Sequence, residues 1–127
     1  MAKVLNAKIT NIPWEDRPEG CFLPVWRYSK NPVIGRNVNE TIERAFNSGF
    51  VPFKDGYAGV FRGDCYSGIF NLYVGFSKDG IHFDIGTEPI HFVDKNGNPV
   101  PDTDYSYDPR VVELEGSYYI IFADKFY

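Results

Sequence analysis

The sequence predicts an all-β protein built from β-propeller blades, of which this chain holds about two. Aromatic residues make up 17% of the 127 residues, and aromatic side chains are common in strands. The 12 glycines and 9 prolines supply the turns that short strands need. Short apolar runs recur between these turns, and their order then starts again near the carboxyl end of the chain. Four short strands followed by such a restart are typical of propeller blades.

Residues 1–46 are expected to form a leader arm that precedes the blades. Prolines and charged residues interrupt each apolar piece of residues 1–35, which predicts irregular structure there. Residues 39–46 hold the one stretch in which we expect a helical turn. The arm is therefore expected to pack on the blades rather than to form a sheet of its own.

Residues 47–93 are expected to form the first blade, which consists of four antiparallel strands. The pairs Asp55-Gly56 and Asp79-Gly80 mark tight turns. Alternation of apolar residues through the third run indicates a half-buried strand. We expect the strands at residues 50–53, 57–62, 69–76 and 81–85, with a longer turn at 63–68 and a polar, proline-rich connection at 94–107.

The start of a second blade is expected at residues 108–127, because the pattern of the first blade begins again there. Residues 47–61 can be laid on residues 108–122 without a gap, which is an offset of 61 residues. Tyr57 then falls on Tyr118. Identities are few, so shared strand patterning explains the match as well as a true repeat does. The period also exceeds the roughly 40–50 residues of common blades.

The repeat places two polar side chains, Asn47 and Asp108, at the head of the first strand of each unit. The first strand of a propeller blade lies innermost, so both side chains are expected to face one central axis. Arg62, at the end of the next strand, is expected to reach the same rim, and Tyr107 lies beside Asp108. Polar groups that converge next to an aromatic ring suit a sugar-binding cleft.

The run Tyr107-Asp108-Pro109-Arg110-Val111 also admits a simpler interpretation. Proline disfavours helical backbone in the preceding residue, so we expect Asp108 to be extended. Alternation along an extended chain then puts Asp108 and Arg110 on the same side, as a surface ion pair at the start of a strand. These five residues alone favour that structural role, and only the rest of the chain favours a site.

Composition and spacing argue against several other classes of protein. The net charge of −4 and the lack of a basic block argue against nucleic acid as a partner. No apolar run approaches membrane-spanning length and no export signal is evident, which favours a cytoplasmic protein that does not bind membranes. Cys21 and Cys65 have no metal or redox spacing, and His82 and His91 lack ligand-like companions, so no metal site is expected.

Several motifs, in this order, resemble the amino-terminal part of glycoside hydrolase family 130, the β-mannoside phosphorylases. The likeness covers most of the chain from about Trp14 onward. The segment YDPRV at 107–111 is similar to the catalytic segment of the family. The other motifs that carry the likeness are WRYSKNPVI at 26–34, FNSGFVPFKDGYAGVFR at 46–62 and LYVGFSKDGIHF at 72–83.

This resemblance implies a five-bladed propeller with its active site on the central axis. It implies an inverting phosphorolysis in which phosphate attacks a β-mannoside and α-mannose 1-phosphate is released. Asp108 would be the general acid, Asn47, Ser48 and Arg62 would hold the mannosyl unit, and Tyr107 would line the site. The partners would be a β-mannoside oligosaccharide and inorganic phosphate as co-substrate, and no cofactor is expected.

The chain departs from the family in its length, since it offers one blade and the start of a second. The basic residues that bind phosphate in the family lie mostly beyond this region. We therefore expect either a piece of a longer product or a short protein whose copies associate, because an open propeller edge exposes unpaired strand groups. A β-mannoside hydrolase of the same family and a non-catalytic carbohydrate-binding or assembly module remain alternatives.

Overall fold

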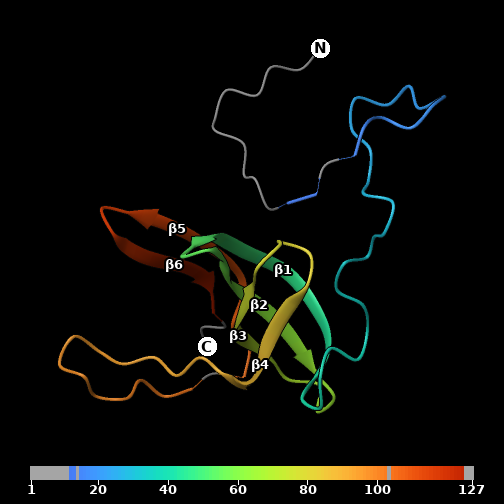
Figure 1. Ribbon diagram of the computed structural model, residues 1–127. Helices are drawn as coiled ribbons and strands as arrows, with labels where there is room; N and C mark the ends of the chain where they lie inside the picture. The colour runs from blue at the N-terminus through green and yellow to red at the C-terminus, as the bar shows by residue number, and fades with distance from the viewer. Residues whose placement is uncertain (1–11, 14, 103, 125–127) are drawn as a thin grey trace.

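The computed structural model describes residues 12–13, 15–102 and 104–124, and this part of the chain is all-β (Figure 1). β1 to β4 form one antiparallel sheet in sequential order, and β5 and β6 form a separate antiparallel hairpin. The predicted all-β class is thus confirmed, with four sequential antiparallel strands followed by a separate hairpin. The strands are β1 (Ile42–Phe53), β2 (Gly56–Cys65), β3 (Phe70–Ser77), β4 (Phe83–Pro89), β5 (Tyr107–Leu114) and β6 (Ser117–Ala123).

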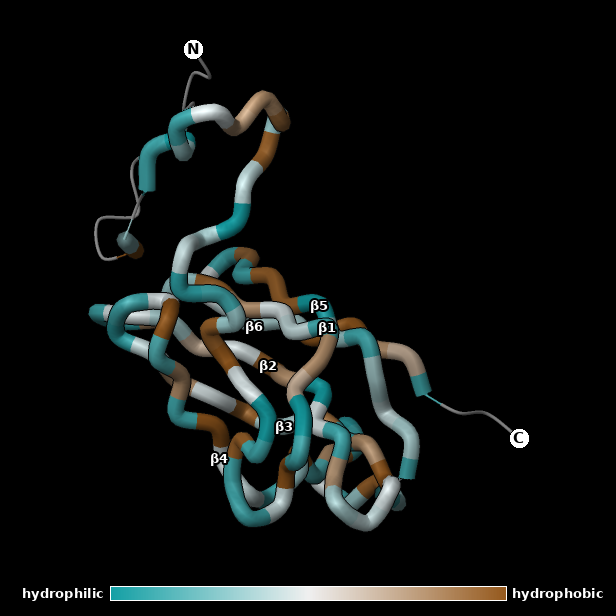
Figure 2. The backbone as a smooth tube through the Cα atoms, turned by 90° about the vertical axis from the view of Figure 1, so that its right-hand side faces the viewer, coloured by the Kyte–Doolittle hydropathy of each residue, from teal (hydrophilic) through white to brown (hydrophobic). Residues whose placement is uncertain are grey.

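The expected helical turn at residues 39–46 is wrong, because β1 already begins at Ile42. The side chain of Asn39 accepts hydrogen bonds from the backbone N–H groups of Thr41, at 3.0 Å, and Ile42, at 2.8 Å. This local side-chain cap turns the chain into the strand, and Ile42 is fully buried there. The described residues before it form no helix or strand, and much of this leader runs away from the sheets (Figures 1 and 2).

β2 is longer than expected, since it continues through Cys65. The turn expected at residues 63–68 is therefore wrong in its first part. Gly63 lies within the strand because the ring of Tyr73 packs over it. A Cβ atom at Gly63 would lie 2.7 Å from that ring. Asp64 therefore lies in a strand and not in a loop. Its side chain projects from the same strand as that of Arg62, one of the predicted site residues.

The core lies on the face of the four-stranded sheet that carries Ile42, Phe61, Tyr73 and Ile85. Ile34 and Val38 of the leader pack against this cluster, so the end of the arm covers the core as expected. Burying each such side chain contributes about 1.5–3 kcal/mol. The Tyr73 hydroxyl lies 3.0 Å from the Cys65 sulfur, and burial raises the pKa of Tyr73 well above its usual range.

The turn between β3 and β4 is built around one carboxylate, that of Asp79. Its Oδ1 accepts hydrogen bonds from the backbone N–H groups of Ile81, at 3.0 Å, and His82, at 2.8 Å. Its Oδ2 lies 2.6 Å from His82 Nδ1. These hydrogen bonds, chiefly that with the His82 side chain, hold the pKa of Asp79 well below its usual range. His82 therefore has a local partner in the carboxylate of Asp79.

Candidate active site at the bulges of two equivalent strands

Two β-bulges, one in β1 and one in β5, repeat with the predicted offset. The pairing of β1 with β2 shifts between Phe46 and Gly49. The pairing of β5 with β6 shifts between Tyr107 and Arg110, which are the equivalent positions 61 residues later. The same irregularity at the same place in both units confirms the internal repeat as a repeat of backbone geometry.

The turn after each bulged strand repeats as well. Lys54 and Glu115, again equivalent residues, both have a φ of 52°. Lys54 lies two residues before Gly56, the first residue of β2, and Glu115 is followed by Gly116, just before β6 begins at Ser117. Shared strand patterning alone does not require two hairpins to match in turn conformation, so this second agreement favours a true repeat.

Asn47 and Asp108 occupy the two bulges with positive φ angles of 39° and 54°. Asp108 is thus not extended, and the expectation based on Pro109 is wrong. The bulge inserts an extra residue into the strand and requires an unusual backbone conformation at this position. Asn and Asp are the non-glycine residues that tolerate left-handed backbone best, which explains why these residue types occur in both bulges. Asp108 is the second residue of β5, but Asn47 lies in the middle of β1 and not at its head as expected, because β1 begins at Ile42.

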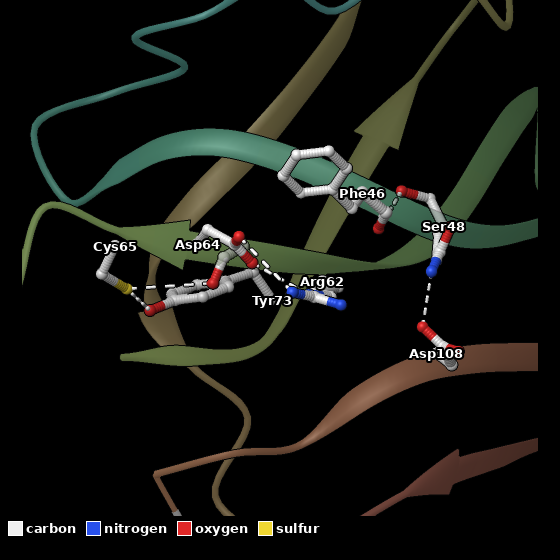
Figure 3. A network of polar contacts seen from close by, with 9 residues as sticks. Phe46, Ser48, Arg62, Asp64, Cys65, Tyr73 and Asp108 are labelled. Atoms are coloured by element: carbon white, nitrogen blue, oxygen red, sulfur yellow. Dashed lines mark hydrogen bonds and ion pairs between the residues drawn. The ribbon is translucent and has the colours of Figure 1, made fainter. Parts of the chain in front are cut away.

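The two side chains meet, as the repeat predicted. Asn47 Nδ2 donates a hydrogen bond of 2.6 Å to Asp108 Oδ1 (Figure 3). The strands approach closely at Gly49, where an added Cβ atom would lie 3.0 Å from Val111 N and 3.3 Å from the Arg110 Cα. Asn47 is exposed and Asp108 is half-buried, so a ligand can reach the pair from solvent.

Arg62 lies next to this pair but is engaged by residues that we did not expect. Its Nε donates to Asp64 Oδ1 at 2.9 Å, and its Nη2 donates to Asp64 Oδ2 at 3.4 Å. The guanidinium carbon also lies 5.5 Å from the centre of the Phe46 ring and 4.4 Å from that of Phe70. Arg62 directly opposes Phe46 in the sheet.

Tyr107 is half-buried, and its ring packs edge-on against Phe70 at 5.9 Å. It is the equivalent of Phe46 in the first unit, so each bulge is preceded by an aromatic residue. Ser48 follows Asn47 in the chain and is exposed. Its hydroxyl donates a hydrogen bond to the Phe46 carbonyl at 3.4 Å.

The expected ion pair between Asp108 and Arg110 does not occur among the described residues. Arg110 is exposed, and its Nη1 donates to the Pro109 carbonyl at 2.9 Å. The bulge between Tyr107 and Arg110 breaks the alternation on which that expectation depended. The simpler interpretation of residues 107–111 depended on this surface ion pair. Asp108 instead accepts a hydrogen bond from Asn47.

Sequence reasoning missed three residues of this cluster: Phe46, Asp64 and Phe70. The first was assigned to the leader, and Asp64 was assigned to a turn. The sequence did contain a signal for Asp64, since Arg62 and Asp64 are two residues apart and share one face of any strand that includes both.

Other ionisable groups make local pairs elsewhere. His91 Nδ1 lies 3.0 Å from Asp102 Oδ2 in the connection before β5. In the residues that the structure describes, no group of three or more His, Cys, Asp or Glu side chains is arranged to hold a metal ion. No described helix is long and apolar enough to cross a membrane.

Together these features define an all-β protein with a polar pair where the equivalent bulges of two strands meet. The family model for β-1,4-mannooligosaccharide phosphorylase, glycoside hydrolase family 130, matches residues 6–127. The chain therefore belongs to this family. It is 40% identical, over 130 aligned positions, to a β-1,4-mannooligosaccharide phosphorylase of Ruminococcus albus. That alignment covers 98% of this chain and 39% of the relative, so the chain spans well under half of the relative's length.

Proposed function

We propose that the polypeptide carrying this chain catalyses inverting phosphorolysis of β-mannosides, with release of α-mannose 1-phosphate. The observation that supports this most strongly is the hydrogen bond between Asn47 and Asp108 at the equivalent bulges of β1 and β5. The family membership supplies the substrate class, since the matching model and the bacterial relative are both described as β-1,4-mannooligosaccharide phosphorylases.

In this proposal Asp108 is the general acid. Its proton goes to the glycosidic oxygen, either directly or through a sugar hydroxyl that Asp108 reprotonates. The bond between the anomeric carbon and that oxygen breaks while a phosphate oxygen forms a bond to the same carbon from the opposite face. A hydrolase needs a second carboxylate to activate water. Phosphate is already an anionic nucleophile, so one carboxyl group suffices.

Asn47 orients the acid in this arrangement. Its amide donates to Oδ1 of Asp108, which fixes the carboxyl plane and leaves Oδ2 to face the substrate. A catalytic group held in one orientation loses less entropy when the reacting atoms meet. We further propose that Ser48, Arg62 and Tyr107 bind the mannosyl unit, with a hydroxyl, a cation and a ring that all lie beside the pair.

Phosphate must be bound by cationic groups. We propose that these come from polypeptide beyond the matched 39% of the relative's length, either as further blades that complete a propeller ring or as other copies of this chain. Inorganic phosphate is the co-substrate, no resident cofactor takes part, and the reaction takes place in the cytoplasm.

Phosphate dependence tests the proposal. The polypeptide carrying this chain is incubated with β-1,4-mannobiose in the presence and absence of inorganic phosphate, and the products are identified by NMR. We expect α-mannose 1-phosphate only when phosphate is present. Release of free mannose without phosphate would instead identify a hydrolase, and binding of mannobiose without any product would identify a non-catalytic module.

A further inference from the structure

Arg62 is held side-on by the carboxylate of Asp64, which has no role in the phosphorolysis proposed above. Arg62 and Asp64 are two residues apart on β2, so both side chains project from the same face of the strand. Two of the Arg62 nitrogens, Nε and Nη2, donate to the two oxygens of Asp64. Each side chain is 22% exposed, so solvent screens this ion pair only partly.

Two aromatic rings hold the guanidinium from the neighbouring strands. Phe46 comes from β1 on one side of β2, and Phe70 comes from β3 on the other. A guanidinium group stacks favourably against aromatic rings, and such contacts restrict its motion. The carboxylate and the two rings together leave Arg62 little freedom to change its rotamer.

These contacts place Arg62 beside both members of the proposed catalytic pair. Phe46 immediately precedes Asn47 in β1. Phe70 packs against Tyr107, which immediately precedes Asp108 in β5. Figure 3 shows Arg62 between Asp64 and the end of the cluster where Asp108 lies.

We propose that Asp64 is a positioning residue for mannoside binding, which it supports by holding Arg62 side-on. This inference rests on the proposed function, because it assigns Arg62 to the sugar. With Nε and Nη2 engaged by Asp64, Nη1 has no partner among the described residues and is available to a sugar hydroxyl. A long side chain that is already ordered loses less entropy on binding than a free one. Asp64 itself does not touch the substrate.

A double-mutant cycle tests this role. Asp64→Asn, Arg62→Ala and the double variant are compared in the polypeptide carrying this chain, with KM for β-1,4-mannobiose and KM for phosphate measured separately. Asp84→Asn serves as the control, since Asp84 is an exposed carboxylate on β4. Asp64→Glu tests whether a longer carboxylate restores binding. Thermal melting of each variant reports whether it folds.

We expect Asp64→Asn to raise KM for mannobiose about tenfold or more while KM for phosphate stays within twofold. The double variant is expected to be no worse than Arg62→Ala alone, because Asp64 acts only through Arg62. Asp64→Glu should recover part of the loss. If Asp64→Asn does not fold, Arg62→Lys takes its place. Lysine keeps the charge but cannot be held side-on, so this variant should also raise KM for mannobiose.

Two kinds of result overturn the inference, and they differ from each other. If the unsubstituted protein releases mannose 1-phosphate but Asp64→Asn or Arg62→Lys binds mannobiose normally, only the role of Asp64 fails. The same holds if the losses from Asp64→Asn and Arg62→Ala simply add. If the unsubstituted protein gives no phosphate-dependent product, the proposed function fails and this inference fails with it.

Discussion

Two residues with left-handed backbone, Asn47 and Asp108, determine the geometry of the candidate site. Each lies in a bulge, Asn47 in β1 and Asp108 in β5, and their side chains are joined by a 2.6 Å hydrogen bond. A bulge redirects a side chain that regular alternation would send to the other face. The repeated bulge is thus the reason that an amide and a carboxyl group meet.

The conformation and the hydrogen bond of Asn47 can be separated by two substitutions. Asn47→Gly loses the hydrogen bond to Asp108 but tolerates positive φ, and we expect it to lower the free energy of unfolding by about 1 kcal/mol. Asn47→Ala loses the same bond and also strains the backbone, at a further cost of about 1–2 kcal/mol.

Urea denaturation of both variants measures the difference. An alanine variant as stable as the glycine variant would mean that Asn47 does not need left-handed backbone. If neither variant differed from the unsubstituted protein, the hydrogen bond would contribute nothing to stability.

The meeting of Asn47 and Asp108 could be predicted from the sequence, but their conformation could not. The offset of 61 residues placed both at equivalent strand heads, and equivalence was enough to predict convergence. Pro109 suggested an extended Asp108, because that rule considers only the neighbouring residue. The bulge arises from the pairing of β5 with β6, which involves residues far from Asp108 in the sequence.

At the scale of elements, β1 and β5 depend on a close backbone approach at Gly49. A methyl group there would meet backbone atoms of Val111 and Arg110, which cannot move aside as a side chain can. We expect Gly49→Ala to push the two strands apart and to lower the free energy of unfolding by about 1–3 kcal/mol. Urea denaturation measures this loss.

Gly86→Ala provides the matched control for that experiment. Gly86 lies in β4, and its nearest atom to an added Cβ is the Val74 oxygen at 3.5 Å, an ordinary contact distance. We expect the free energy of unfolding of this variant to be close to that of the unsubstituted protein. Equal losses in the two variants would show that the contact between β1 and β5 is not tight.

Strand order and the second hairpin followed from apolar patterning, whereas several strand ends did not. The start of β1 at Ile42 was missed because the segment before Asn47 has no clear alternation and contains good helix formers. The extension of β2 to Cys65 was missed because Gly63 resembles a turn residue in sequence. Only the packing of Tyr73 across the sheet shows why a glycine is needed there.

The placement of Arg62 beside the site was expected, but the residues that hold it were not. Asp64 comes from the end of β2, where a turn had been predicted, whereas Phe70 lies at the start of β3, in a strand that had been predicted. The error in the turn therefore hid the ion pair with Asp64, whereas the contact with Phe70 crosses from β2 to β3 and depends on their packing.

At the scale of the whole molecule, the hairpin of β5 and β6 presents an open apolar face. Alternation and pairing put four exposed side chains on it, namely Val112, Leu114, Tyr119 and Ile121. Contiguous apolar surface of this kind marks an interaction site in many proteins. We expect the chain on its own to self-associate as its concentration rises.

Sedimentation velocity over a range of concentrations measures this association. Ile121→Lys places a charge on the open face and should weaken association, whereas Val93→Lys, at an exposed site between β4 and β5, should not. A compact monomer at every concentration would contradict the expectation.

In the proposed reaction the carboxyl group of Asp108 is the acid of a phosphorolysis. The most direct measurement is the rate of phosphate-dependent release of α-mannose 1-phosphate from β-1,4-mannobiose by Asp108→Asn, compared with Asp84→Asn. Asparagine preserves the shape of the side chain but cannot supply the proton. We predict a loss of about 100-fold or more for Asp108→Asn and a nearly unchanged rate for Asp84→Asn. A rate for Asp108→Asn within a few-fold of the unsubstituted protein would contradict the claim.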